Sequence, residues 1–436
     1  MDRGNGLGTN LSIYIAIPFC QHKCSYCDLN AYAGLNHLMP AYTTALAKEI
    51  RLIGQGTEEK AHSLYFGGGT PSLMPLEQLA EIISAIRGTF VLTDDCEISL
   101  EANPDSVDAA YLDGLRTLGV NRLSFGAQSA QANELELFQR THTFEQVVEA
   151  VRLARGAGFA NISLDLIYGA PGQTMASWQD TLTKSIALDP DHFSIYALSL
   201  DFGTPMRAWV NRGLLPEPDD SLAADMYEWA DEELAQAGFG QYEISSWARV
   251  GEQWAVSSKQ WTVSSKQWAV NSEQWAVNSE QWRPFTVHCS PFTGFQCRHN
   301  LQYWLNLPYL GLGAGAHGCI GGYRYSNVAS PTAYIRRMDA TAGEPKPFPF
   351  SPALADSIPV DAKTEMDETM LTGLRLVGEG VKRESFQRRF GVAVEDVYAK
   401  ELRELKERGL TEWDEAGARL TKSGRLVANW VFEKFV

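Results

Sequence analysis

The stretch Cys20-Gln-His-Lys-Cys24-Ser-Tyr-Cys27 holds three of the chain's seven cysteines and follows an apolar segment, Ile13–Ile17. Three thiolates on one tight loop can bind a soft metal ion or an iron–sulfur centre. A structural zinc site would take a fourth ligand and usually shows paired CxxC motifs. His22 could supply that ligand only with strain, because it lies inside the loop. Three thiolates on a four-iron cubane instead leave one iron open to a further ligand. From the spacing alone, zinc binding and redox chemistry remain alternatives.

Short apolar segments alternate with amphipathic helical patterns over residues 11–200. We expect strands at Ile13–Ile17, Leu64–Phe66, Glu97–Leu100, Arg122–Phe125, Ile162–Ile167 and Phe193–Leu198. We expect helices at Ala41–Ile53, Leu76–Arg87, Ala109–Leu118, Ala130–Phe138, Phe144–Ala157 and Ala176–Leu188. Such alternation forms parallel sheets, with functional residues at the carboxyl ends of the strands. Six units are fewer than the eight of a closed barrel, so the sequence predicts an α/β fold with an open, partial (β/α)6 barrel.

The barrel core is expected to span residues 1–248, with a further helix at Ala224–Gln236 and a strand at Tyr242–Ser246. A seven-residue repeat, QWAVSSK and close variants, fills residues 253–282. Each Trp lies about 200° around a helix from the Val two positions later, so no single apolar stripe forms and a coiled coil is not expected. We expect residues 249–296 to be a disordered surface insertion, with an aromatic binding array as the alternative.

Two segments follow the repeat. Residues 297–344 are expected to close the barrel, and a Pro-rich connector, Pro345–Pro359, opens residues 345–436. Helical patterns then occur at Glu365–Leu376, Lys382–Phe390, Val394–Arg408 and Arg419–Phe435. They predict a small, mainly helical C-terminal domain, of helical-bundle or winged-helix type, that serves as a lid or a docking surface.

Charge and composition restrict the partners and the compartment. The net charge is −16, from 37 basic and 53 acidic residues, and no basic patch offsets it, so nucleic acid binding is disfavoured. No run of about 18 apolar residues predicts a transmembrane segment. Residues 1–10 lack the pattern of a secretory signal, and seven unevenly spread cysteines do not form a disulfide framework. We therefore expect a cytoplasmic protein.

The cysteine loop, followed by Gly67-Gly68-Gly69-Thr70-Pro71, resembles the radical S-adenosylmethionine superfamily. The resemblance implies a [4Fe–4S] cluster on Cys20, Cys24 and Cys27, with S-adenosylmethionine chelating the open iron. Glycines without Cβ atoms would let the end of the second strand approach the methionine ammonium group. The radical chemistry would belong to the cofactor rather than to side chains.

Further segments look like the branch of this superfamily that contains coproporphyrinogen dehydrogenases and haem chaperones (HemW). They are Ile13–Cys20, Glu101–Pro104, Phe125–Ser129 and Asp165–Pro171, and the likeness runs from Leu11 to Val436 apart from the Trp repeat. By similarity, the S-adenosylmethionine pocket would be lined by Tyr14, Tyr26, Gly68, Gly69, Thr70, Glu101, Gln128, Arg140 and Asp165. Glu101 and Asp165 suit ribose hydroxyls or the ammonium group, and the guanidinium of Arg140 suits the carboxylate.

Two features separate the two functions within this branch. The dehydrogenases carry a further cysteine where this chain has Leu29, and they have a long segment before the first strand. Arg298–Trp304 matches the HNxxYW motif of the haem chaperones, which implies that His299 is an axial ligand of haem iron. In a helix, His299 and Tyr303 would share a face. Cys289 and Cys297 are expected to be unliganded thiols.

Gly311-Leu-Gly-Ala-Gly-Ala-His317 resembles part of a dinucleotide-binding fingerprint but lacks its third glycine. In the family a similar run touches S-adenosylmethionine, which leaves His317 as a pocket wall residue or a core histidine.

We expect a haem chaperone that binds a [4Fe–4S] cluster, S-adenosylmethionine and haem. It would pass haem to acceptor proteins, membrane-bound haem enzymes among them. The alternative functions are an oxygen-independent coproporphyrinogen III oxidase and, more remotely, a zinc-stabilised interaction protein. Whether the chain is an enzyme stays undecided.

Overall fold

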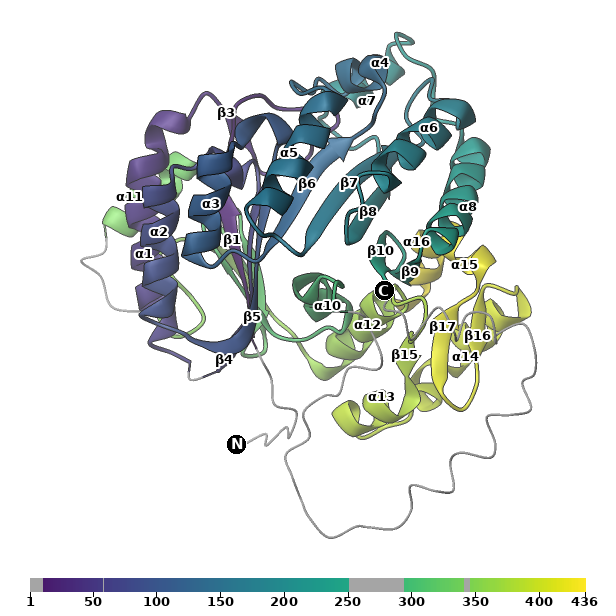
Figure 1. Ribbon diagram of the computed structural model, residues 1–436. Coiled ribbons are helices and arrows are strands. Elements are labelled where there is room, and N and C mark those ends of the chain that lie inside the picture. Colours follow the sequence, from purple (N-terminus) through teal and green to yellow (C-terminus); the bar gives the residue numbers. More distant parts are fainter. Residues whose placement is uncertain (1–10, 58, 251–293, 341–345) are drawn as a thin grey trace.

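The computed structural model (Figure 1) describes residues 11–57, 59–250, 294–340 and 346–436. The Trp repeat and nearly all of the expected insertion at 249–296 lie outside these residues. A twelve-stranded sheet dominates the fold, and its central strands run parallel in the order of the chain. These strands are β1 (Leu11–Ile17), β4 (Lys60–Gly68), β5 (Val91–Ala102), β6 (Arg122–Gln128), β7 (Ile162–Tyr168) and β8 (His192–Ala197).

Helices cover the outer face of this curved sheet (Figure 1). They are α1 (Met39–Gly54), α2 (Leu76–Arg87), α3 (Ala109–Leu118), α5 (Phe144–Gly156), α6 (Met175–Ile186) and α8 (Asp220–Gln236). The short helices α4 (Ala132–Leu137) and α7 (Pro205–Asn211) lie beyond the carboxyl ends of the strands (Figure 1). The predicted α/β fold with an open, partial (β/α)6 barrel is therefore confirmed. Gly119 (φ 94°) and Gly158 (φ 84°) follow α3 and α5 in the left-handed region, whereas Gly88 after α2 stays right-handed.

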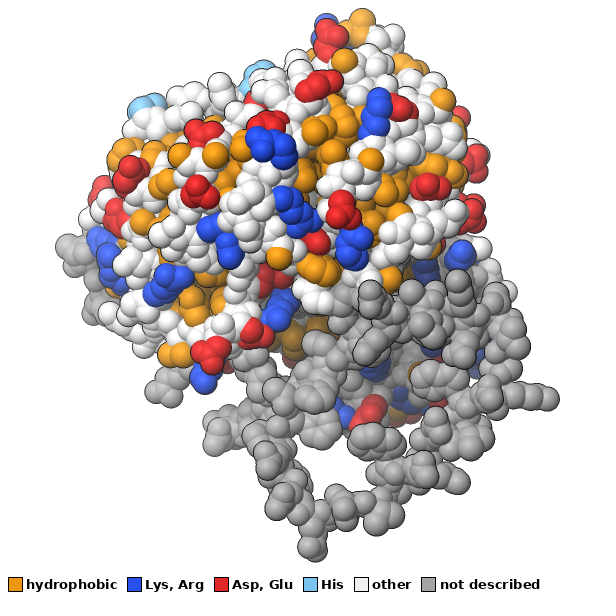
Figure 2. Space-filling view, in the orientation of Figure 1, with side chains coloured by type: hydrophobic (Ala, Val, Ile, Leu, Met, Phe, Trp, Pro, Cys, Tyr) orange, Lys and Arg blue, Asp and Glu red, His pale blue; other side chains and the backbone are white. Residues whose placement is uncertain are grey.

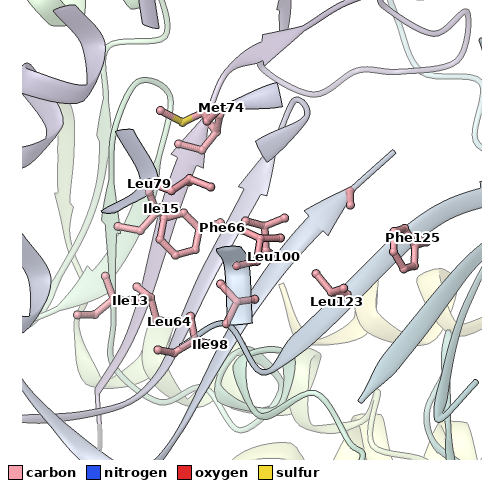
Figure 3. Packing of buried hydrophobic residues seen from close by; sticks show 14 of the residues in the cluster. Ile13, Ile15, Leu64, Phe66, Met74, Leu79, Ile98, Leu100, Leu123 and Phe125 are labelled. Atoms are coloured by element: carbon pink, nitrogen blue, oxygen red, sulfur yellow. The ribbon is translucent and has the colours of Figure 1, made fainter. Parts of the chain in front are cut away.

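The parallel strands place apolar side chains on the outer face and polar side chains on the inner face. On β5, Ile98 and Leu100 are buried against the helices, while Glu97, Ser99 and Glu101 alternate with them. Figure 3 shows the outer set, in which side chains of neighbouring strands pack together and against Met74 and Leu79. Parallel strands that are buried on both faces usually have continuous apolar sequences. The alternation seen here therefore indicates that the inner face of the barrel is polar.

Additional strands extend both edges of the sheet. On one edge lie β10 (Ser246–Arg249) and β9 (Phe239–Glu243), so the single predicted strand Tyr242–Ser246 is wrong. The chain turns at Ile244 and Ser245, and its two arms pair with each other.

The other edge carries β11 (Tyr309–Leu312), which is parallel to β1, and then three antiparallel strands. These are β12 (His317–Ile320), β13 (Tyr323–Asn327) and β14 (Leu354–Pro359). The expected connector Pro345–Pro359 thus contains an edge strand. Pro359 is tolerated at the end of such a strand because it need not donate to a ladder.

A short helix, α10 (Arg298–Trp304), lies inside the concave face of the sheet (Figure 1). The carboxylate of Glu97 on β5 accepts hydrogen bonds from the backbone N–H groups of Arg298 (3.2 Å) and His299 (3.4 Å). A negative charge at a helix N-terminus satisfies free N–H donors and complements the helix dipole. The inner face of the barrel therefore fixes the start of the HNxxYW helix.

The C-terminal domain combines helices with a small sheet. Its helices are α12 (Ala362–Gly373), α13 (Arg383–Phe390), α14 (Val394–Glu407), α15 (Lys422–Leu426) and α16 (Ala428–Phe432). Its antiparallel strands are β15 (Val381–Lys382), β17 (Gly417–Leu420) and β16 (Thr411–Trp413). Of the two predicted types, the winged-helix arrangement is the one observed. The expectation of a helical segment from Arg419 is wrong at its start, because Arg419 lies in β17 and pairs with Glu412.

This domain packs against the end of α10. The guanidinium of Arg375 lies 4.2 Å from the ring centre of Trp304, and Arg389 donates to the carbonyl of Asn306 (2.7 Å) while pairing with Glu365. None of its described residues lines either of the two cavities presented below. In this structure the domain therefore contacts the C-terminal end of α10, and its role as a lid or a docking surface stays a prediction.

The helical face shown in Figure 2 carries Lys and Arg side chains interspersed with Asp and Glu. No helix within the described ranges is long and apolar enough to cross a bilayer.

Glu49 of α1 joins the barrel to its closing segment. Its side chain is 1% exposed and accepts hydrogen bonds from the Gly313 N–H (2.8 Å), Asn327 (2.9 Å), Tyr334 (2.6 Å) and Ser351 (2.6 Å). Burial raises the pKa of Glu49, and these donors oppose that shift.

We predict that Glu49→Ala lowers the free energy of unfolding by about 3 kcal/mol, because several buried donors lose their acceptor. Urea denaturation followed by circular dichroism measures the effect. Glu81→Ala, on the exposed side of α2, is the matched control and should change stability little. Equal stability of the two variants would contradict the role assigned to Glu49.

Candidate functional site

A cavity of about 510 Å³ opens at the carboxyl ends of the parallel strands. It collects most of the residues predicted from the sequence, although they come from segments far apart in the chain. Those that line it are Cys20, Cys24, Tyr26, Cys27, Gly68, Gly69, Thr70, Glu101, Gln128, Arg140 and Asp165. Tyr14 and His299 do not line it.

The three thiols lie along one wall of this first cavity. Thr70 donates to the sulfur of Cys20 (3.5 Å), and Arg140 donates to the sulfur of Cys24 (3.4 Å). Burial raises the pKa of Cys20, and raises that of Cys27 to about 11. Iron would therefore displace protons from these sulfurs when it binds. In the part of the chain that the structure describes, no three Cys, His, Asp or Glu side chains are grouped to hold a single metal ion.

This donor set fits the cluster that the family resemblance implies. Soft sulfur ligands on one wall suit iron–sulfur chemistry, and hydrogen-bond donors such as Thr70 and Arg140 favour the thiolate form. Cys20, Cys24 and Cys27 would hold the cluster, and the cavity beside them is large enough for a small molecule.

The glycine run ties the cysteine loop to the end of β4. Gly69 and Thr70 donate to the carbonyls of Ile17 and Phe19, each at 2.8 Å. A Cβ on Gly69 would lie 2.5 Å from the Phe19 oxygen, and Gly68 has a φ of 113°. Position 69 therefore needs a glycine because the backbone of Phe19 leaves no room for a Cβ. The sequence argument had explained the glycine run only by the approach of a ligand.

Two half-buried carboxylates, those of Glu101 and Asp165, line the first cavity. Glu101 accepts from the Tyr65 hydroxyl (2.9 Å) and from the Gly68 N–H (3.0 Å), while Asp165 accepts from Ser124 (3.0 Å). Burial and then the charge of Asp165 raise the pKa of Glu101 to about 7, and burial raises the pKa of Asp165. Both carboxylates retain free acceptor positions for hydroxyl or ammonium donors.

Arg140 and Gln128 complete the rim. The guanidinium of Arg140 donates to Asn103 (2.7 Å) and to the Gly126 carbonyl (2.9 Å), which fixes its orientation beside Cys24. Gln128 ends β6 with a φ of 64°. A left-handed backbone at a residue other than glycine stores about 1–3 kcal/mol of strain and often marks a binding site.

A second cavity, of about 470 Å³, lies beside the first and contains Tyr14. Gly68, Asp28 and Leu29 line both cavities. The remaining walls of the second cavity are formed by Ala16, Ile17, Pro18, Asn30, Tyr303, Tyr309, Ala314, Gly315, Ala316 and His317. Leu29, which stands where the dehydrogenases carry a cysteine, is 52% exposed.

His299 lines neither cavity and is only 1% exposed. Its Nδ1 is hydrogen-bonded to Ser63 (3.0 Å) and its Nε2 to the Tyr303 hydroxyl (2.8 Å). Its ring stacks on Tyr65 at 5.0 Å. Burial lowers the pKa of His299 to about 3, so the imidazole is neutral at physiological pH. Both ring nitrogens are therefore occupied in this conformation.

Two other residues of the motif, Asn300 and Tyr303, line the cavities instead. Asn300 lines the first cavity, Tyr303 lines the second, and Trp304 contacts the C-terminal domain. The sequence argument also missed Arg122, Ser124 and other polar residues that line the cavity floor. The polar side of the strand alternation would have identified them, because every second residue of β5 to β8 faces inward.

We predict that Glu101 makes S-adenosylmethionine binding depend on pH. Above its pKa of about 7 the carboxylate is ionised and attracts the cationic ligand, so affinity should increase by up to about tenfold from about pH 6 to about pH 8. Calorimetric titration of wild type and Glu101→Gln measures this. The difference between the two proteins isolates Glu101 from titration of the ligand, and an identical pH dependence would contradict the prediction.

We predict that Cys24→Ala abolishes most cluster assembly, because one of the three thiolate ligands is lost. Iron and acid-labile sulfide are measured after anaerobic reconstitution. Cys96→Ala is the control, since Cys96 is equally a free cysteine but lines neither cavity. Unchanged iron and sulfide in Cys24→Ala would exclude Cys24 as a ligand.

Comparisons with known proteins agree with these features. Residues 14–184 match the model of the radical SAM superfamily, and residues 360–427 match that of the HemN C-terminal domain. The chain is 33% identical to the heme chaperone HemW of Bacillus subtilis, covering 98% of this chain and 99% of the relative. It is 30% identical to the mitochondrial radical S-adenosyl methionine domain-containing protein 1 of Bos taurus, covering 95% and 85%.

Among solved structures, coproporphyrinogen III oxidase (HemN) from Escherichia coli superposes with a TM-score of 0.75. It shares 24% identity over 98% of this chain and 90% of that chain, which supports the fold. The three-cysteine loop, the glycine run against it and the near full-length similarity lead to one conclusion. The chain belongs to the heme chaperone HemW family of the radical SAM superfamily.

Proposed function

We propose that this protein is a haem chaperone, which binds haem and transfers it to acceptor proteins. The observation that carries the proposal is the similarity to proteins named heme chaperone HemW over nearly the whole chain. The Arg298–Trp304 motif of these chaperones supports it, because it forms a helix that contributes Asn300 to the first cavity and Tyr303 to the second.

The superfamily uses a [4Fe–4S] cluster and S-adenosylmethionine, and we propose that both occupy the first cavity. Cys20, Cys24 and Cys27 would bind the cluster. Tyr26, Gly68, Gly69, Thr70, Glu101, Gln128, Arg140 and Asp165 would bind S-adenosylmethionine. When bound, these groups supply one-electron chemistry. The protein contributes the positioning: the half-buried carboxylates of Glu101 and Asp165 would accept from hydroxyl and ammonium groups, and the guanidinium of Arg140 is fixed beside the thiols.

Tyr14 was expected to line the S-adenosylmethionine pocket, but it does not line the first cavity, so we propose a different role for it. Tyr14 lines the second cavity, and its ring centre lies 6.1 Å from that of Tyr65, which lines the first, and 6.0 Å from that of His299. Burial raises its pKa strongly, so the hydroxyl stays protonated. We propose that Tyr14 forms part of the partition behind the S-adenosylmethionine pocket.

For haem, we propose that the α10 side of the second cavity forms the binding surface. Coordination of haem iron by His299 remains a prediction, and it requires that Nε2 exchange its Tyr303 partner for iron. The acceptors would be haem proteins, including membrane-bound enzymes, and the compartment would be the cytoplasm.

The alternative is oxidative decarboxylation of coproporphyrinogen III. The fold of the solved oxidase is shared, but the chain has Leu29 in place of the further cysteine of the dehydrogenases. We therefore favour the chaperone.

We predict that the reconstituted full chain binds haem and produces no vinyl porphyrin. Ferric haem is titrated anaerobically while the Soret band is followed, and porphyrin products are separated after incubation with coproporphyrinogen III, S-adenosylmethionine and a reductant. His299→Ala should weaken haem binding, because the ring holds Tyr303 at the cavity wall.

His37→Ala provides the control, since His37 is exposed and lines neither cavity. A wild-type protein that leaves the Soret band of free haem unchanged would exclude the chaperone function. Formation of protoporphyrinogen IX would establish the oxidase instead.

A further inference from the structure

His317 lies at the start of β12, on the strand face that points into the barrel. Tyr309 of β11 pairs with Cys319 of β12, so these two residues share a face. Side chains two residues apart on a strand point to the same side, which places His317 on the face of Cys319 and Tyr309. Gly318 and Ile320, on the opposite face, are buried. Both His317 and Tyr309 accordingly line the second cavity.

The second cavity combines three tyrosine rings with small apolar residues, and Asp28 and Asn30 also line it. Tyr14, Tyr303 and Tyr309 line it, and the rings of Tyr303 and Tyr309 meet edge to face at 4.6 Å. Alanine, isoleucine, proline and leucine side chains form the rest of its apolar lining, whereas Asp28, Asn30 and His317 supply the other polar side chains. Its volume of about 470 Å³ lies in the range of small-molecule sites. Aromatic and small apolar side chains suit a planar, apolar ring system better than a polar ligand.

The two histidines near this cavity differ in availability. His299 is buried and both its nitrogens are hydrogen-bonded. His317 is exposed, and none of the hydrogen bonds among the described residues engages its imidazole. An imidazole with a free nitrogen can bind iron without losing a partner, whereas His299 must first give up Ser63 or Tyr303.

We propose that His317 is an axial ligand of haem iron in the second cavity, with Tyr303 and Tyr309 contacting the porphyrin. This inference rests on the proposed haem-binding function and specifies its site. A neutral imidazole is a common axial ligand of haem, and the tyrosine rings offer their faces or edges to the macrocycle. His299 is then a positioning residue, which orients Tyr303 through the 2.8 Å hydrogen bond.

The two cavities share lining residues, which places the proposed haem site beside the proposed S-adenosylmethionine pocket. Gly68 and Leu29 line both cavities, so haem in the second lies next to the S-adenosylmethionine pocket in the first. Tyr14 packs against the ring of Tyr65, whose hydroxyl donates to Glu101. Haem and S-adenosylmethionine therefore bind on opposite sides of one set of residues.

The test compares His317→Ala, His299→Ala and Tyr303→Phe with wild type and with His37→Ala. Ferric haem is titrated into each full-length protein, and electron paramagnetic resonance reports the axial ligands. His317→Ala should weaken haem binding by at least about tenfold and remove the histidine signature. Added imidazole should restore that signature in His317→Ala, because the free base fills the vacated position. His299→Ala and Tyr303→Phe should weaken binding while the histidine signature persists.

Three results would overturn the inference. His317→Ala with wild-type affinity and spectrum excludes His317 as the ligand. Loss of the histidine signature in His299→Ala, with His317→Ala unaffected, assigns the ligand to His299 and leaves the chaperone function intact. Absence of haem binding by wild type rejects the proposed function itself. Thermal unfolding of each variant shows whether weakened binding reflects loss of the fold, and since His317 is exposed we expect an unchanged melting temperature.

Discussion

The division of each parallel strand into an apolar face and a polar face is the constraint on which this structure depends. Ile98 and Leu100 of β5 pack under the helices, while Glu97 and Glu101 on the same strand point inward. The outer face supplies the hydrophobic burial that stabilises the barrel. The inner face is thereby free to carry carboxylates, which hydrogen bonds and the buried guanidinium of Arg122 stabilise. A one-residue shift in register would exchange the two faces and destroy both the core and the site.

The polar interior also holds α10. Glu97 binds the start of this helix, Arg389 of the C-terminal domain binds the carbonyls that follow its end, and His62 bonds to Gln302 on its side (3.0 Å). A seven-residue helix is too short to be stable alone, so these contacts determine its position. Because Asn300 faces one cavity and Tyr303 the other, α10 connects the proposed cofactor pocket with the proposed haem pocket.

Sequence reasoning identified the strands of the barrel, and most of the site residues that it predicted line the first cavity. It succeeded there because alternating strands and helices place the carboxyl ends of all parallel strands at the same end of the barrel, whatever the sequences of the loops. It was less successful with Tyr14 and His299. Neither lies at a strand end, and their positions depend on how β11 and α10 pack inside the barrel.

The amino-acid pattern alone was sufficient for the barrel, the thiol loop and the family, because each depends on local spacing: period two in strands, three to four in helices, and three cysteines in one turn of chain. Packing between distant segments determined that His299 is buried and that His317 is exposed. His299 and His317 are both polar residues beside aromatic or glycine motifs, and nothing in their local sequence separates them. The contacts of Ser63 and Tyr303 with one ring, and the strand face of the other, exist only when β4, α10 and β12 come together.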